Sequence, residues 1–202
     1  MRMASRSPVP SVLSSLTLLS VALVAGGCRH LAPAGFDAGF PSGSGWTRVE
    51  QVHLRTQNHL HDCGAAALDM VLLRWGRAAP ARAQAAMDAT TGFTAGELRD
   101  QARGLGLDAF VFPGAVDDLL FEIDHARPVI VGVARDHANR RLAHFVVVVG
   151  HDSPGDRFLV ADPDQGWGVI ARADLDRAWS VAGHVTLVIH PRAGVTPIAA
   201  AP

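Results

Sequence analysis

The spacing of hydrophobic residues changes near Leu105, and this change constrains the fold more than any other feature of the chain. Before Leu105, apolar residues recur at helical spacing, most clearly at Leu68, Val71, Leu72 and Trp75. After it come short runs rich in β-branched residues, separated by Asp, Asn, Pro and Gly, which is the pattern of strands. Helices followed by strands predict an α+β domain, in which a helical N-terminal half packs on an antiparallel sheet and a cleft separates the two parts.

Local signals give the expected bounds of these elements. Helices are predicted to begin at Asp62, near Pro80, at Thr94 and at Ala115. Asp62 can cap the first helix, and Gly76 is placed to end it. Thr94 and Glu97 have the spacing of a capping box, and Gly104 is placed to close their helix. Strands are expected over residues 107–112, 129–134, 145–149, 158–161 and 185–189.

Length and charge indicate one domain without a polyanionic partner. The chain has 202 residues, of which 49% are hydrophobic, and this is enough for one domain with a proper core. Its 18 basic residues are all arginine and are balanced by 19 acidic ones, so the net charge is −1. That charge gives no general attraction to nucleic acid or anionic lipid. We expect a monomer that binds no nucleic acid.

Residues 1–27 have the layout of an export signal. Arg2 and Arg6 form a basic start, and the apolar run over residues 12–24 is too short to be interpreted first as a membrane-spanning helix. The run ends in Leu23-Val-Ala-Gly-Gly-Cys28, which resembles a bacterial lipobox. We therefore expect a lipid on Cys28 and an exported protein held to a membrane of the cell envelope. Cleavage further on, after Ala34, is the alternative.

The segments that flank the expected domain have a different composition. Residues 28–48 are rich in Gly, Pro, Ala and Ser without periodicity, which predicts a flexible tether. Residues 191–202 are similar and predict a disordered tail. The folded domain is therefore expected over residues 49–190.

Cys63 lies where a short polar stretch meets the first turn of the predicted helix. A thiol at this position gains from the helix dipole and from unpaired backbone N–H groups, and both favour the thiolate. If Cys28 carries a lipid, Cys63 is the free thiol of the exported domain. The alternative is a Cys28–Cys63 disulfide, which is the ordinary expectation for two cysteines outside the cytoplasm.

A base and an orienting carboxylate are available further along the chain. His144 opens the most apolar strand, and Asp162 ends the strand after it. If the two strands pair as a hairpin through residues 153–156, the start of one lies beside the end of the other, and the two side chains meet. Taken singly, each residue has a plainer explanation: a small buried cysteine, a hydrogen-bonded histidine or a turn-forming aspartate.

Together these segments resemble peptidase family C39, the papain-like cysteine peptidases best known as leader-cleaving domains of bacteriocin exporters. The resemblance spans about residues 51–190. It lies in Gln57 six positions before Cys63, in Asp62-Cys-Gly-Ala-Ala-Ala-Leu68, in His144-Phe-Val-Val-Val148 and in Asp162-Pro163. It implies a papain-like fold and a peptide or protein substrate.

The resemblance also implies a role for each matching residue. It makes Cys63 the nucleophile, His144 the general base and acid, Asp162 the group that orients His144, and Gln57 an oxyanion-hole donor. The implied reaction hydrolyses a peptide bond through a thioester acyl-enzyme, without a cofactor. Gly64 and Asp62 are assigned to substrate binding, since Gly64 leaves no side chain beside the nucleophile.

Other functions stay open at this point. Exporter peptidases are cytosolic and fused to membrane spans and an ATPase, so whether this chain cleaves after a double glycine stays open. A C39-like domain can bind peptides without cutting them, and an acyl-enzyme can transfer its acyl group to an acceptor other than water. His59, His61 and Cys63 alternate as soft metal ligands do, but no second cluster of such residues completes a site, and we expect no metal.

Overall fold

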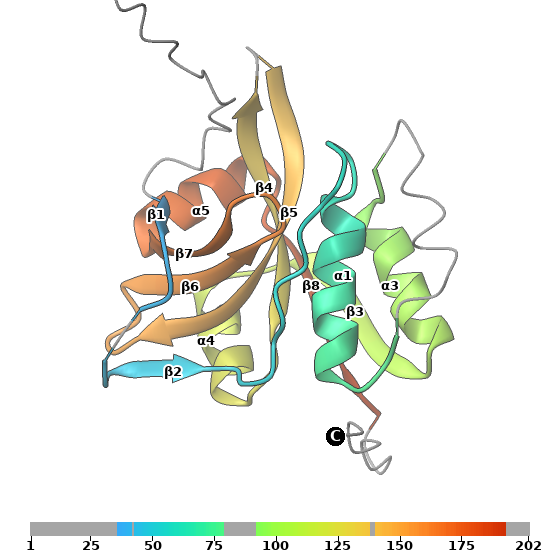
Figure 1. Ribbon diagram of the computed structural model, residues 1–202, viewed down its shortest axis with the longest axis horizontal. Helices are drawn as coiled ribbons and strands as arrows, with labels where there is room; N and C mark the ends of the chain where they lie inside the picture. Colours follow the sequence, from blue (N-terminus) through green and yellow to red (C-terminus); the bar gives the residue numbers. More distant parts are fainter. Residues whose placement is uncertain (1–35, 42, 79–91, 138–139, 193–202) are drawn as a thin grey trace, which may run out of the picture.

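The computed structural model describes residues 36–41, 43–78, 92–137 and 140–192 (Figure 1). Its helices are α1 (Cys63–Arg74), α3 (Ala95–Gly104), α4 (Val116–Asp124) and α5 (Arg172–Val181). Its strands are β1 (Phe36–Ala38), β2 (Trp46–Arg48), β3 (Leu107–Pro113), β4 (Val129–His137), β5 (Arg140–Asp152), β6 (Arg157–Asp162), β7 (Gly166–Ala171) and β8 (Val185–Pro191). None of the helices in this part of the chain is long and apolar enough to span a membrane.

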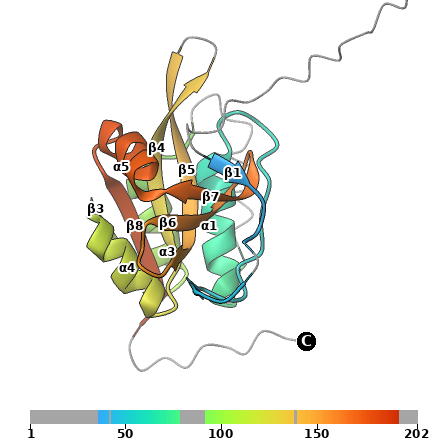
Figure 2. The ribbon, with the colours of Figure 1, turned by 90° about the vertical axis from the view of Figure 1, so that its left-hand side faces the viewer.

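The strands form one antiparallel sheet in the order β1-β7-β6-β5-β4-β8-β3. The pairing of β4 with β5 ends at Val129 and Val148. β2 pairs with the part of β5 that follows, where Trp46 lies opposite Asp152. Helices cover both faces of the sheet, α1 and α3 on one side and α4 and α5 on the other (Figure 2). The predicted α+β fold, with helices of the N-terminal half on an antiparallel sheet, is confirmed.

The residues of β5 explain why helices cover both faces. Val147 and Val149 belong to the core beneath α1 and α3, whereas Val146 and Val148 belong to the core beneath α4 and α5. Successive side chains of a strand point to opposite faces of the sheet. An unbroken apolar run therefore predicts a strand that is buried on both faces, and the four valines are at most 2% exposed.

The predicted helices agree with the structure except at one cap and in one segment. α3 has the expected capping box, in which the Thr94 hydroxyl accepts from the Glu97 N–H and the Glu97 carboxylate accepts from the Thr94 N–H. α1 begins at Cys63, but the side chain of Asp62 does not cap it. Asp62 Oδ2 instead accepts the His59 N–H at 2.9 Å, which closes the preceding loop. The helix expected near Pro80 lies outside the described residues.

Two predictions about boundaries need correction. The stretch interpreted as a flexible tether, residues 28–48, supplies β1 and β2, so the folded part begins before residue 49. Each of these strands has three residues, too few to show a periodic pattern. β5 begins at Arg140, so His144 lies inside the strand and not at its start. The β4–β5 hairpin extends past the other strands (Figure 1). The arginines at the start of β5 interrupt the apolar pattern that would predict a strand there.

Candidate active site

The site forms where β6 ends and β5 continues with β4 as its neighbour. The last β5–β6 pair joins Val147 to Ala161, so the part of β5 that contains His144 has no β6 neighbour there. The loop between these strands spans residues 153–156, as predicted for a hairpin. The hairpin brings His144 and Asp162 into contact, and the predicted proximity of the two is confirmed by their hydrogen bond.

The N-terminus of α1 packs against the same part of β5. A Cβ atom at Gly64 would lie 3.2 Å from Phe145 Cδ2 on β5 and 3.3 Å from Leu98 Cδ1 on α3. Packing between these elements therefore explains why position 64 has no side chain. Asp62, assigned above to substrate binding, is 2% exposed and bonded to its own loop, so this assignment does not fit its burial.

Cys63 lies at the first position of α1 and is hydrogen-bonded to His144. Its sulfur also accepts backbone N–H groups, from Phe145 and from Gly64. Burial raises the pKa of the Cys63 thiol, but the hydrogen bond and positive charge of His144, together with the backbone donors, outweigh burial. The pKa of Cys63 therefore lies below its ordinary value, and the site favours a thiolate. Cys63 is a free thiol, and Cys28 lies outside the described residues.

His144 connects the thiol to Asp162. His144 Nε2 lies 2.8 Å from Asp162 Oδ1, and the two side chains are 4% and 0% exposed. Burial lowers the pKa of His144, but the hydrogen bonds and negative charges of Asp162 and Cys63 outweigh it and raise this pKa to about 9. The imidazole is therefore held as imidazolium at neutral pH.

The Asp162 carboxylate accepts its hydrogen bonds through one oxygen, Oδ1. Besides His144, Oδ1 accepts the backbone N–H of Asp164 at 2.8 Å and that of Gln165 at 3.3 Å. Oδ2 is buried and has no hydrogen-bond partner among the described residues. Burial raises the pKa of this carboxyl, but the bond to His144, the Asp164 N–H and the charge of Arg135 bring the pKa below its ordinary value. Cys63, His144 and Asp162 thus form a line of thiolate, imidazolium and carboxylate.

Gln57 is joined to the same region through its backbone. Its N–H donates to the carbonyl of Pro163 at 2.8 Å, which ties the loop before α1 to the turn after β6. The side-chain Nε2 donates one hydrogen to the His59 carbonyl at 2.9 Å. A second N–H of this amide is left for another acceptor.

The sequence reasoning missed Arg135, which is 9% exposed and lies on β4. Its Nη1 is 3.2 Å from His144 Nε2, and its Nη2 donates to the carboxylate of Asp164. A charged residue at an inward-facing strand position is a sequence signal of a functional or paired group. It could be recognised here only with the register of β4 against β5, which places Arg135 opposite Leu142.

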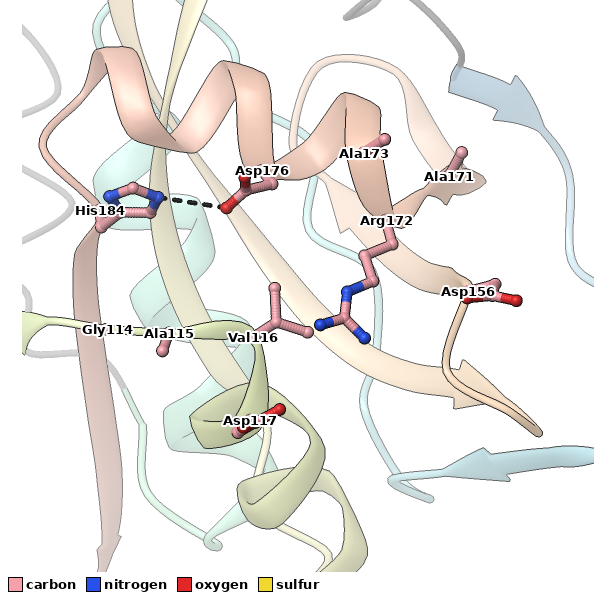
Figure 3. A pocket seen from close by; sticks show the side chains of 10 residues that line it. All are labelled: Gly114, Ala115, Val116, Asp117, Asp156, Ala171, Arg172, Ala173, Asp176 and His184. Carbon is pink, nitrogen blue, oxygen red and sulfur yellow. Dashed lines mark hydrogen bonds and ion pairs between the residues drawn. The ribbon is translucent and has the colours of Figure 1, made fainter.

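A separate pocket of about 670 Å³ lies between the N-terminal ends of α4 and α5 (Figure 3). Arg172 projects into it, and His184 Nε2 lies 3.2 Å from Asp176 Oδ1 at its side. None of the residues that line it belongs to the line of Cys63, His144 and Asp162. The residues that line it include no thiol or hydroxyl side chain, and the pocket is distinct from the candidate site.

Metal binding at the candidate site finds no support in the geometry. His59 and His61 are exposed loop residues. Within the described ranges, no group of three or more His, Cys, Asp and Glu side chains could hold a metal ion. The thiol of Cys63 is instead hydrogen-bonded to His144.

Comparison with solved structures relates this fold to known peptidase domains. The chain is similar to the peptidase domain of Streptococcus ComA, a bifunctional ABC transporter of a quorum-sensing pathway, with 23% identity and a TM-score of 0.56 over 70% of this chain and 99% of that one. A Bacillus anthracis protein described as a C39-like peptidase gives 16% identity and a TM-score of 0.56 over 73% and 98% of the two chains. A double glycine motif protease from an AMS/PCAT transporter was solved in complex with a leader peptide. It gives 25% identity and a TM-score of 0.55 over 71% of this chain and 94% of that one.

The family model supports the same relationship from the sequence. Among curated proteins no significant match was found. The model of the peptidase C39 family, in contrast, matches residues 51–194, a region that contains α1 and strands β3 to β8 with Cys63, His144 and Asp162. Since this match covers more than half of the chain, the protein belongs to the peptidase C39 family.

Proposed function

We propose that the protein is a cysteine peptidase that hydrolyses peptide bonds with Cys63 as nucleophile, His144 as general base and acid, and Asp162 as the group that orients His144. One observation carries the proposal: hydrogen bonds run without interruption from the Cys63 sulfur through the imidazole to the Asp162 carboxylate. Membership of a family of cysteine peptidases supports it. Nε2 of His144 is engaged by Asp162, which leaves Nδ1 as the ring nitrogen for the sulfur.

In the first half of the reaction, the Cys63 thiolate attacks the carbonyl carbon of the peptide bond. His144 then gives its proton to the departing nitrogen, the carbon–nitrogen bond breaks, and a thioester to Cys63 remains. The contact between Asp162 and Nε2 holds the ring so that its other nitrogen faces the sulfur. Asp162 also stabilises the imidazolium before the proton is transferred.

In the second half, neutral His144 takes a proton from water, and the oxygen of that water attacks the thioester. The acyl product leaves as a carboxylic acid, and the thiolate and imidazolium form again. If an amine attacked in place of water, the same intermediate would give a transferase. The two outcomes differ only in the acceptor.

Gln57 and the backbone of Cys63 are the proposed donors to the oxyanion. The first N–H groups of a helix have no intrahelical partner, and that of Cys63 opens α1. The Gln57 backbone is anchored on Pro163, and its amide retains one hydrogen after the bond to His59. Such donors contribute on the order of 3 kcal/mol each to the transition state.

The proposed substrate is a peptide or protein. The transporter protease that this chain resembles is named for a double glycine motif and was solved with a leader peptide. A Gly-Gly peptide is therefore one of the substrates to be tested, beside peptides without that motif. We also propose that a lipid on Cys28 holds the protein to a membrane of the cell envelope, on the strength of the lipobox-like sequence.

The test is a cleavage profile of a mixed peptide library by mass spectrometry. The full chain is compared with Cys63→Ala and with Cys28→Ser as the matched control, because these are the chain's two cysteines. Cleavage that persists in Cys28→Ser and is absent in Cys63→Ala supports the proposal. Binding without cleavage by the unmodified chain would favour the non-catalytic alternative, and amide products in place of acids would indicate a transferase.

A further inference from the structure

Arg135 is a second charged group in contact with the imidazole of His144. On β4 and β5, Val133 lies opposite His144 and Arg135 lies opposite Leu142, so Arg135 and His144 are diagonal neighbours on one face of the sheet. Arg135 Nη1 is 3.2 Å from His144 Nε2, the same nitrogen that lies 2.8 Å from Asp162 Oδ1. Two groups of opposite charge therefore compete for one nitrogen.

The chemistry of the guanidinium makes this competition unequal in the two states of the ring. A guanidinium can only donate hydrogen bonds. In the imidazolium, Nε2 donates to Asp162, and Arg135 is a cation beside a cation. In the neutral ring that remains after Nδ1 has given up its proton, Nε2 still donates to Asp162, and Arg135 lies beside an uncharged ring. Arg135 therefore opposes the imidazolium that Asp162 favours.

Asp164 controls this opposing charge. Its carboxylate accepts from Arg135 Nη2 and from the side-chain amide of Gln165, and it is 13% exposed. Its backbone N–H donates to Asp162 Oδ1 at 2.8 Å. Arg135, His144, Asp162 and Asp164 thus form a closed ring of contacts. The carboxylate of Asp164 both holds the guanidinium in place and offsets its field at His144.

We propose that Arg135 and Asp164 are positioning residues that set how firmly His144 holds its proton. The charged groups that face the imidazole are Cys63 from α1, Asp162 from β6 and Arg135 from β4, with Asp164 behind Arg135. Two of the three direct contacts favour the imidazolium, and Arg135 alone opposes it. The value of this arrangement for catalysis rests on the proposed function, because His144 must release its proton to the departing nitrogen.

The test is an NMR titration of the His144 ring in the full chain carrying Cys63→Ala, which removes the coupled thiolate. Arg135→Gln takes away the opposing cation and leaves the Asp164 carboxylate, so the midpoint should rise by about 1 pH unit. Asp164→Asn keeps the shape and the backbone N–H but removes the compensating charge, so the midpoint should fall. Arg135→Lys retains the cation and should stay close to the parent.

Opposite shifts separate this role from a merely structural one, because loss of packing would move both midpoints in the same direction. Midpoints that do not move, or that move together, would overturn the proposal. If Arg135→Gln does not fold, Asp164→Asn decides the question alone, since its fall is expected independently. The titration uses no substrate, so opposite shifts, found while the parent chain with Cys63 intact cleaves no peptide, would disprove the proposed function and leave this inference standing.

Discussion

Asp162→Asn removes the charge behind His144 while keeping the shape of the side chain. Oδ1 receives three N–H donors, from His144, Asp164 and Gln165, so the new amide must place its oxygen there and its NH₂ at the position of Oδ2. The hydrogen bond to His144 survives, and the lost interaction is the attraction between carboxylate and imidazolium. The variant thus isolates the electrostatic part of the pair.

The size of the effect follows from the pKa of His144. The ordinary value of 6.5 is raised to about 9, and Asp162 is the main group that raises it. Neutralisation of Asp162 should therefore lower the His144 midpoint by about 1 pH unit or more, which is on the order of 1 kcal/mol. The Cys63 midpoint should rise at the same time, because a weaker imidazolium stabilises the thiolate less.

The sign of each change can be read from pH profiles. Alkylation of Cys63 requires the thiolate and should begin at higher pH in Asp162→Asn. The alkaline limb of peptide cleavage, which reports loss of the imidazolium, should move down from about 9. Asp108→Asn is the control. Asp108 lies on β3, at the edge of the sheet, and its Oδ1 is 3.3 Å from Arg192 Nε. Profiles that coincide for the parent and Asp162→Asn would refute the reasoning.

Three further predictions concern other parts of the molecule. Gln57→Ala should slow peptide cleavage by about 100-fold while leaving the alkylation profile of Cys63 nearly intact, because an oxyanion donor acts in the transition state; equal losses in both assays would make Gln57 structural. Cys28→Ser should release the protein from membranes on cell fractionation, and unchanged fractionation would rule out the anchor. Gly64→Ala should lower the free energy of unfolding by about 1–3 kcal/mol in urea titrations. Gly104→Ala, where a Cβ meets nothing within 4 Å, should cost far less, and equal costs would contradict the packing argument.

The contact between His144 and Asp162 could be predicted because it depends on local information. The two residues lie on consecutive strands joined by a short loop. Antiparallel pairing places the earlier part of β5, which contains His144, beside the end of β6, which is Asp162. The position of Cys63 at the start of α1 was equally local, since a polar stretch precedes an apolar helical pattern. The capping box of α3 needed only the spacing of Thr94 and Glu97.

What could not be predicted depends on register and on distant pairing. Arg135 lies beside His144 only because the β4–β5 hairpin pairs as far as residues 137 and 140, and nothing in the composition of those residues indicates it. β1 and β2 are strands because β7 and β5 offer them hydrogen bonds. The side chain of Asp62 turned to His59 and not to the helix, a choice between two nearby N–H groups that spacing alone does not decide.

The most direct test of the account is the pH dependence of Cys63 alkylation in the full chain, followed by mass spectrometry at that residue. We predict a midpoint well below the value of about 8.5 for an ordinary thiol, because His144 and the backbone donors together outweigh burial. In His144→Ala only the backbone donors oppose burial, so the midpoint should rise toward the ordinary value or above it. An ordinary profile that is the same in both proteins would contradict a thiolate held by His144.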